Sequence, residues 1–157
     1  MIWACAYGHK RYILGHIPEY GPGGGEGIDL ETLTGTMVAY QKTLIRGFPE
    51  PGRSEHAIYV RNLLTGRIVH RVPNAEAFYP GDIGGGDIGD IVVKRDGAVA
   101  WTAETGVQPA VIQVWADDQL GRRLLASSTG IAPRSLKLTG STLKWLEDGK
   151  PAYAILH

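Results

Sequence analysis

The sequence repeats one pattern three times: an alternating apolar and polar strand, a glycine turn, and a second strand that ends in an aromatic side chain. The three copies read IDLETLTGTMVAY over 28–40, IVVKRDGAVAW over 91–101 and LKLTGSTLKW over 136–145. The turn glycines are Gly35, Gly97 and Gly140, and the terminal aromatics are Tyr40, Trp101 and Trp145. Alternation with a period of two is typical of a strand with one buried face. The repeat therefore predicts three equivalent antiparallel hairpins in an all-β protein.

Further strands follow each hairpin in the same order. Third strands are predicted at 57–62, 111–118 and 152–156, and fourth strands at 66–72 and 121–126. The glycine- and proline-rich stretches 18–27, 46–55 and 74–89 are predicted loops, because such residues disfavour regular structure. No segment has a convincing helical pattern. We expect one domain over 1–157, with units at 28–73, 90–126 and 134–157 and an extra hairpin within 2–17.

Three segments carry a resemblance to a known family: DGAVAW (96–101), VWADDQLGRRLL (114–125) and GSTLKWLEDGKPAYAIL (140–156). They resemble the blades of WD40-like and TolB-like β-propellers, especially poorly characterised bacterial proteins of that type. The resemblance covers roughly residues 28–157. It implies four-stranded antiparallel blades in a propeller-like arrangement, with about three blades in this chain, and a role as a binding platform.

Three blades are too few to close a ring, because propellers typically have about 4–8. Residues 3–15 resemble 114–126, the third and fourth strands of a blade. We therefore expect a homodimer through the N- and C-terminal strands, in which each chain is half of a six-bladed propeller. Unpaired blade edges would otherwise favour aggregation. Two alternatives stay open: the chain is part of a longer propeller, or it forms a curled open sheet.

Charge and hydropathy limit the possible partners. Lys and Arg total 16 and Asp and Glu total 16, so the chain lacks the basic excess that nucleic-acid binding requires. No apolar run approaches the ~18 residues of a membrane span. The N-terminus has no signal-peptide pattern, which leaves a cytoplasmic location or an export signal outside this chain. Cys5, the one cysteine, is expected to be a small buried apolar residue.

A glycine-rich segment, GDIGGGDIGD over 81–90, holds the only metal candidates: Asp82, Asp87 and Asp90. Carboxylates on flexible backbone suit Ca²⁺, although the spacing does not match an EF-hand. The apolar Ile83 and Ile88 instead favour a loop that packs against the protein.

No local motif indicates catalysis or a cofactor. The histidines lack the spacing of a metal site, and His70 is expected to be a core or edge residue of its strand. The polyglycine stretch within 18–27 lacks the Lys-Ser/Thr and helix of a phosphate-binding loop. All four tryptophans are expected in the core or between sheets, whereas Arg67, Arg122 and Arg123 are expected to be solvated charges at sheet edges.

These features favour a non-catalytic binding or scaffold module, whose protein or small-molecule ligand lies at the loops of one face or in a central channel. One alternative is a propeller-based hydrolase or lyase, with residues such as Asp82, Asp87 and His70 converging on the channel. A self-assembling structural subunit is another. An enzyme should show several titratable side chains directed into one concave pocket, which a scaffold does not need.

Overall fold

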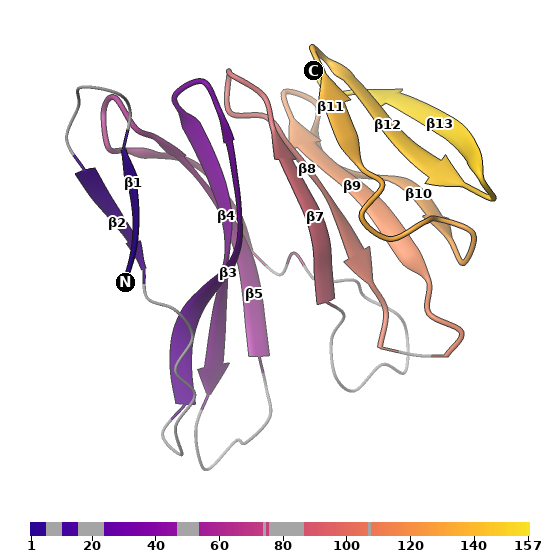
Figure 1. Cartoon of the computed structure of the whole chain (residues 1–157), viewed down its shortest axis with the longest axis horizontal. Helices are drawn as coiled ribbons and strands as arrows, with labels where there is room; N and C mark the ends of the chain where they lie inside the picture. Colours follow the sequence, from indigo (N-terminus) through magenta and orange to yellow (C-terminus); the bar gives the residue numbers. More distant parts are fainter. Residues whose placement is uncertain (6–10, 16–23, 47–53, 74, 76–86, 107) are drawn as a thin grey trace.

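The computed structural model describes residues 1–5, 11–15, 24–46, 54–73, 75, 87–106 and 108–157. Within these ranges the chain forms strands and turns and no helix, which confirms the all-β prediction. The strands build four antiparallel sheets that follow one another in chain order (Figure 1).

The first hairpin contains β1 (Ile2–Cys5) and β2 (Arg11–Gly15). The next sheet contains β3 (Gly24–Thr34), β4 (Met37–Arg46), β5 (Ser54–Asn62) and β6 (Ile68–Pro73). It is followed by the sheet of β7 (Asp87–Val93), β8 (Val99–Glu104), β9 (Ile112–Asp118) and β10 (Gly121–Ser128). The last sheet contains β11 (Lys137–Thr139), β12 (Thr142–Glu147) and β13 (Lys150–Ile155).

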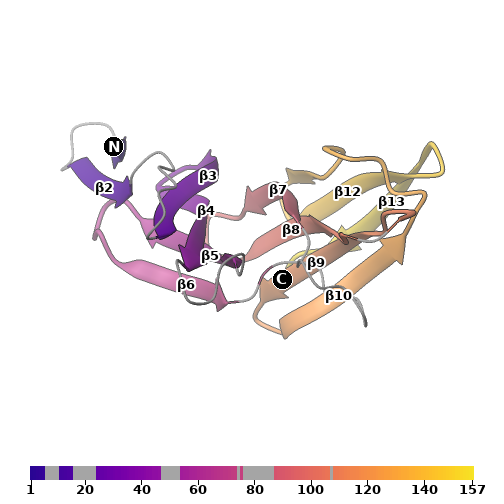
Figure 2. The same cartoon turned by 90° about the horizontal axis from the view of Figure 1, so that it is seen from below.

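Each sheet is a meander, in which strands adjacent in sequence are also paired in space. As a result the first strands β3, β7 and β11 each form one edge of their sheet, and β7 contacts both β3 and β11. The fourth strands β6 and β10 lie at the opposite side of the row, as Figure 2 shows.

The predicted turns lie where the backbone needs them. Gly97 has φ of 100° between β7 and β8, a region that side chains disfavour. Asp148 and Gly149 both have positive φ, 50° and 72°, between β12 and β13. Positive φ at both central residues is the geometry of a type I′ turn, which follows the right-handed twist of a hairpin.

The sheets pack face to face, and three apolar clusters fill the spaces between them. One cluster lies between β1–β2 and the β3–β6 sheet, and another joins that sheet to β7–β10. The last joins β7–β10 to β11–β13. Burial of apolar area between successive sheets is therefore the main source of stability.

The aromatic side chains of the repeat have equivalent surroundings. Tyr40, Trp101 and Trp145 lie on the second strands of their sheets and are 2%, 0% and 4% exposed. Each belongs to the cluster shared with the preceding sheet. Tyr40 stacks on Tyr59 at 5.7 Å between ring centroids, and Trp101 stacks on Trp115 at 6.3 Å. The three aromatic side chains therefore occupy equivalent positions in successive sheets.

Part of the predicted loop at 18–27 is a strand. Gly24 to Gly27 pair with Arg46 to Thr43 of β4, so long-range pairing overrides the weak strand propensity of glycine. Likewise β7 begins at Asp87 and includes residues assigned to the 74–89 connection. Both corrections have one reason, which is that pairing with the next strand supplies hydrogen bonds that composition does not reveal.

Two predictions about side chains were wrong, those for Trp3 and Cys5. Trp3 is 53% exposed and Cys5 is exposed, because both lie on the face of the β1–β2 hairpin that points away from the β3–β6 sheet. Arg122 lies over the rings of Trp101 and Trp115, and Arg123 forms a salt bridge with Asp118. Both arginines lie on the edge strand β10, and Arg122 is exposed, as expected for charges at a sheet edge. These contacts show that they also contribute to packing.

Candidate functional site

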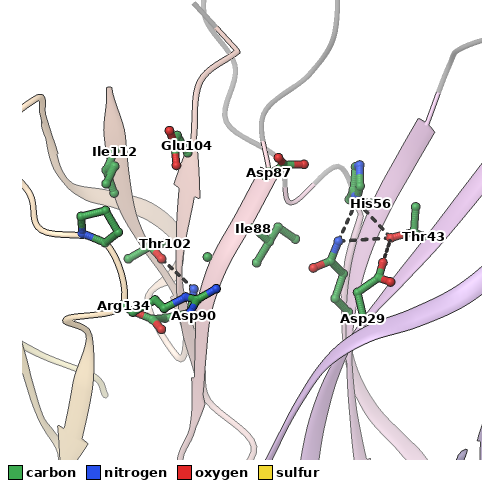
Figure 3. A pocket seen from close by; sticks show the side chains of 13 residues that line it. Asp29, Thr43, His56, Asp87, Ile88, Asp90, Thr102, Glu104, Ile112 and Arg134 are labelled. Carbon is green, nitrogen blue, oxygen red and sulfur yellow. Dashed lines mark hydrogen bonds between the residues drawn. The ribbon is translucent and has the colours of Figure 1, made fainter. Parts of the chain in front are cut away.

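A cavity of about 890 Å³ lies between the β3–β6 and β7–β10 sheets and extends to the segment before β11. Its walls come from strands far apart in the sequence, which face one another across the space in Figure 3. The lining residues are Asp29, Gln41, Thr43, His56, Asp87, Ile88, Gly89, Asp90, Thr102, Glu104, Ile112, Pro133 and Arg134.

One wall is a hydrogen-bonded network on β3, β4 and β5. The Thr43 hydroxyl donates to Asp29 Oδ2 at 2.6 Å. Gln41 Nε2 contacts Thr43 Oγ1 at 3.1 Å and His56 Nδ1 at 2.7 Å. Gln41 and Thr43 are 4% and 3% exposed, so these bonds form in a largely dry environment. A satisfied buried network holds its members in one geometry.

The network determines which nitrogen of His56 carries the proton. Gln41 Nε2 bears only hydrogens, so His56 Nδ1 accepts the 2.7 Å bond. A neutral His56 then has its proton on Nε2, on the ring edge opposite to the network (Figure 3). The cavity is thus offered a hydrogen-bond donor whose orientation is set by buried neighbours.

The other wall depends on a glycine in β7. The Asp90 amide donates to Thr102 Oγ1 at 2.8 Å, across the irregularity in the pairing of β7 with β8. A Cβ on Gly89 would lie 2.7 Å from the same oxygen. Glycine is therefore required for the two strands to approach in this way.

Asp90, a carboxylate of this wall, has a raised pKa. Burial raises its pKa, an effect opposed by the Leu136 amide, which donates to Oδ2 at 3.1 Å, and by the charge of Arg134. The net change in the pKa of Asp90 is upward, because burial disfavours the charged carboxylate more than the Leu136 amide and Arg134 favour it. Through Leu136 the same carboxylate also ties β7 to the segment that leads into β11.

The cavity has an acidic lining. Among the described residues that line it, the carboxylates are those of Asp29, Asp87, Asp90 and Glu104, and the one guanidinium is that of Arg134. With His56 neutral this is a formal excess of three negative charges. A site of this kind attracts cationic groups and hydrogen-bond donors and repels anions.

Thr43 is unsuited to act as a nucleophile in this setting. Its hydroxyl is 3% exposed and its proton is directed to Asp29 Oδ2. A nucleophilic hydroxyl must reach substrate and pass its proton to a base. The Asp29–Thr43–His56 arrangement therefore positions His56, and the groups available to a ligand are His56 and the carboxylates.

The predicted metal ligands are only partly accounted for. Asp87 and Asp90 line the cavity, while Asp82 lies outside the described residues. In the portion of the chain that is described, no group of three or more His, Cys, Asp or Glu could hold a metal ion.

His70 is not part of this site, so its predicted convergence with Asp87 was wrong. It lines a separate cavity of about 170 Å³, where its Nε2 lies 3.2 Å from Asp117 Oδ2. The approach lacks hydrogen-bond geometry. Since β6 runs at the outer side of its sheet, His70 cannot reach a cavity lined by β3 and β7.

Sequence reasoning missed most of the site, including Asp29, Gln41, Thr43, Glu104 and Arg134. It treated His56 only as one of five histidines without the spacing of a metal site. The one local signal was that Asp29 belongs to the first predicted strand of the repeat and that Asp87 and Asp90 closely precede the second copy.

Comparisons with known proteins add no relative: no family model, curated protein or solved structure matches this chain. Among the described residues there is also no helix long and apolar enough to cross a membrane, as expected from the sequence.

Proposed function

We propose that this protein is a β-propeller-type binding module whose ligand occupies the cavity between the β3–β6 and β7–β10 sheets. The ligand is a small polar molecule that carries an amino or guanidinium group beside hydroxyl groups. One observation carries the proposal: acidic side chains from separate sheets surround a preorganised His56 in a cavity of about 890 Å³. A cavity of this size with few convergent polar groups is typical of small-molecule sites.

The repeat supports the propeller part of the proposal. Three successive sheets share one strand order, and each directs its second-strand aromatic toward the preceding sheet. Their first strands lie along one side of the row (Figures 1 and 2). In propellers the first strands line the central channel, so the cavity would open there.

The binding proposal is tested by nuclear magnetic resonance titration of the labelled protein with spermidine and with glucosamine. We expect saturable shifts of amide signals from β3, β5 and β7. Replacement of a lining carboxylate, Asp87→Asn or Glu104→Gln, should weaken binding, whereas Glu147→Gln on β12 should not. Shifts that fail to saturate with both probes, or that are unchanged in both lining variants, would refute the proposal.

A second candidate, a hydrolase or lyase, is favoured by the convergence of titratable groups itself. His56 with its proton on Nε2 could polarise a substrate oxygen by donating a hydrogen bond, and a carboxylate of the opposite wall could act as a general base. Hydrolysis of p-nitrophenyl esters and glycosides by the intact protein, abolished in His56→Gln, would identify an enzyme. Equal rates of hydrolysis for the wild type and the variant would refute the enzyme candidate and leave the binding module as the proposed function.

We also propose that a second copy of the chain completes the ring. The uncovered face of β1–β2 presents Trp3 opposite Ile13, and that of β12–β13 presents Leu146, Tyr153 and Ile155. In the chain itself such faces pack against the next sheet, so the outer face of β1–β2 in one copy would lie on that of β11–β13 in the other. The same contact would then form twice between the two copies, and the two contacts together would close the dimer.

The two terminal faces are more polar than the covered ones. Lys144 stands at the position that Ala39 and Ala100 occupy in the other sheets, where both alanines are fully buried. We therefore expect a looser association than between sheets of one chain. Light scattering should give twice the chain mass, and Tyr153→Glu with Trp3→Glu should give the monomer. If the wild-type protein were a monomer, the proposed dimer would be refuted, whereas the proposed ligand site would not be affected.

A further inference from the structure

A second cavity, of about 670 Å³, lies at the other end of the same three edge strands. β3 contributes Thr32 and Thr34, β7 leads into Lys94 and Arg95, and the turn after β11 contributes Ser141. Along β7 the acidic cavity ends at Asp90 and this one begins at Val92. The two cavities therefore share their strands but not their residues.

The charge of this cavity is opposite to that of the first. Of the described residues that line it, the charged ones are Lys94 and Arg95, and none is a carboxylate. Lys94 is partly neutralised, because its Nζ lies 2.9 Å from Asp96 Oδ2 and donates to the Leu156 carbonyl at 3.2 Å. Arg95 is exposed and forms no ion pair with any residue that the structure describes. The guanidinium of Arg95 is thus available to an external anion.

Arg95 lies beside the turn between β3 and β4. Its Cγ, Nε and Cδ lie 3.6–3.8 Å from the position that a Cβ on Gly35 would take. The side chain therefore lies along this turn, which restricts its rotamers before a ligand arrives. A guanidinium oriented in advance loses less entropy when it binds an oxyanion in a bidentate way.

Neutral donors surround this cation. Thr32, Thr34 and Ser141 carry hydroxyl groups, and each of the edge strands β3 and β7 directs half of its backbone amides away from its sheet. Hydroxyl and amide donors around an arginine are suited to phosphate or carboxylate oxygens. The side chains of Val92, Val93 and Leu138 add apolar surface for a carbon skeleton.

We propose that this basic cavity binds the oxyanion of a small molecule, a phosphate or carboxylate group, with Arg95 as its main ligand. The size of the cavity exceeds that of a free phosphate ion, so the group would belong to a larger molecule that contacts Val92 and Leu138. The proposal does not depend on the function assigned to the acidic cavity, since different residues carry it.

The test is a titration of the labelled full-length protein with inorganic phosphate, glucose 6-phosphate and acetate, at an ionic strength kept constant with sodium chloride. We expect saturable shifts at Arg95, Ser141 and Thr34, with glucose 6-phosphate bound more tightly than inorganic phosphate. Arg95→Gln should weaken binding by about tenfold, the usual effect of one lost charged hydrogen bond. Arg95→Lys should retain part of it, because the charge remains.

Two matched variants complete the design. Arg67→Gln removes an exposed arginine that lines neither cavity and should leave the affinity unchanged. Asp87→Asn alters the acidic cavity and should also leave it unchanged, which separates this result from the proposed function. Shifts that do not saturate, or an equal loss in Arg95→Gln and Arg67→Gln, would overturn the proposal.

Discussion

Trp101 offers the sharpest test of how the sheets hold together. It is fully buried, stacks on Trp115, and its Nε1 donates to the Ala75 carbonyl at 2.8 Å. The guanidinium of Arg122 lies 5.4 Å from its ring. One side chain therefore joins the β7–β10 sheet to the end of the β3–β6 sheet by apolar contact, stacking and a hydrogen bond.

We expect Trp101→Ala to lower the free energy of unfolding by about 3–5 kcal/mol, the usual effect of truncating a buried tryptophan. Domains are stable by only about 5–15 kcal/mol, so the variant should be close to unfolding. Trp101→Phe keeps most of the apolar contact but leaves the Ala75 carbonyl without its donor, and should cost about 1–3 kcal/mol.

Urea denaturation followed by circular dichroism measures both variants without relying on tryptophan fluorescence. Leu120→Ala is the control, because Leu120 is 66% exposed in the turn between β9 and β10, and it should cost less than about 1 kcal/mol. If Trp101→Ala cost no more than Leu120→Ala, the sheets would not be joined through Trp101 and the packing argument would be refuted.

Two further predictions concern Asp118 and Gly89. The pKa of Asp118 is held below its ordinary value of 3.8 mainly by the Arg123 guanidinium and also by the amides of Leu120 and His157. The ionised Asp118 therefore stabilises the folded state fully above pH 3.8, and this stabilisation is lost as the pH falls toward the folded-state pKa. Asp118→Asn should therefore destabilise the protein by about 2–4 kcal/mol at pH 7 and by clearly less near pH 3, and an equal loss at both pH values in thermal unfolding would contradict this account. Gly89→Ala should cost about 1–3 kcal/mol in urea denaturation because the new methyl group meets Thr102 Oγ1, and the double variant with Thr102→Ala should cost less than the sum of the two single changes.

The sequence alone was sufficient for the repeat and for most of the strands. Apolar alternation and the glycines at 35, 97 and 140 are local signals, and each glycine has the positive φ that a tight turn needs. The aromatic of each second strand was also predictable as a buried residue, because the pattern repeats it at the same place. Local chemistry decides these features, so they can be read without knowledge of distant parts of the chain.

Tertiary structure decided the sites. Asp29, Thr43 and His56 are separated by more than a dozen residues each, and only the pairing of β3 with β4 and β4 with β5 brings them into one network. The charge difference between the two cavities likewise arises because β3, β7 and β11 lie side by side, which no short motif records. Burial and electrostatic environment depend on contacts between sheets, and these contacts are properties of the folded chain.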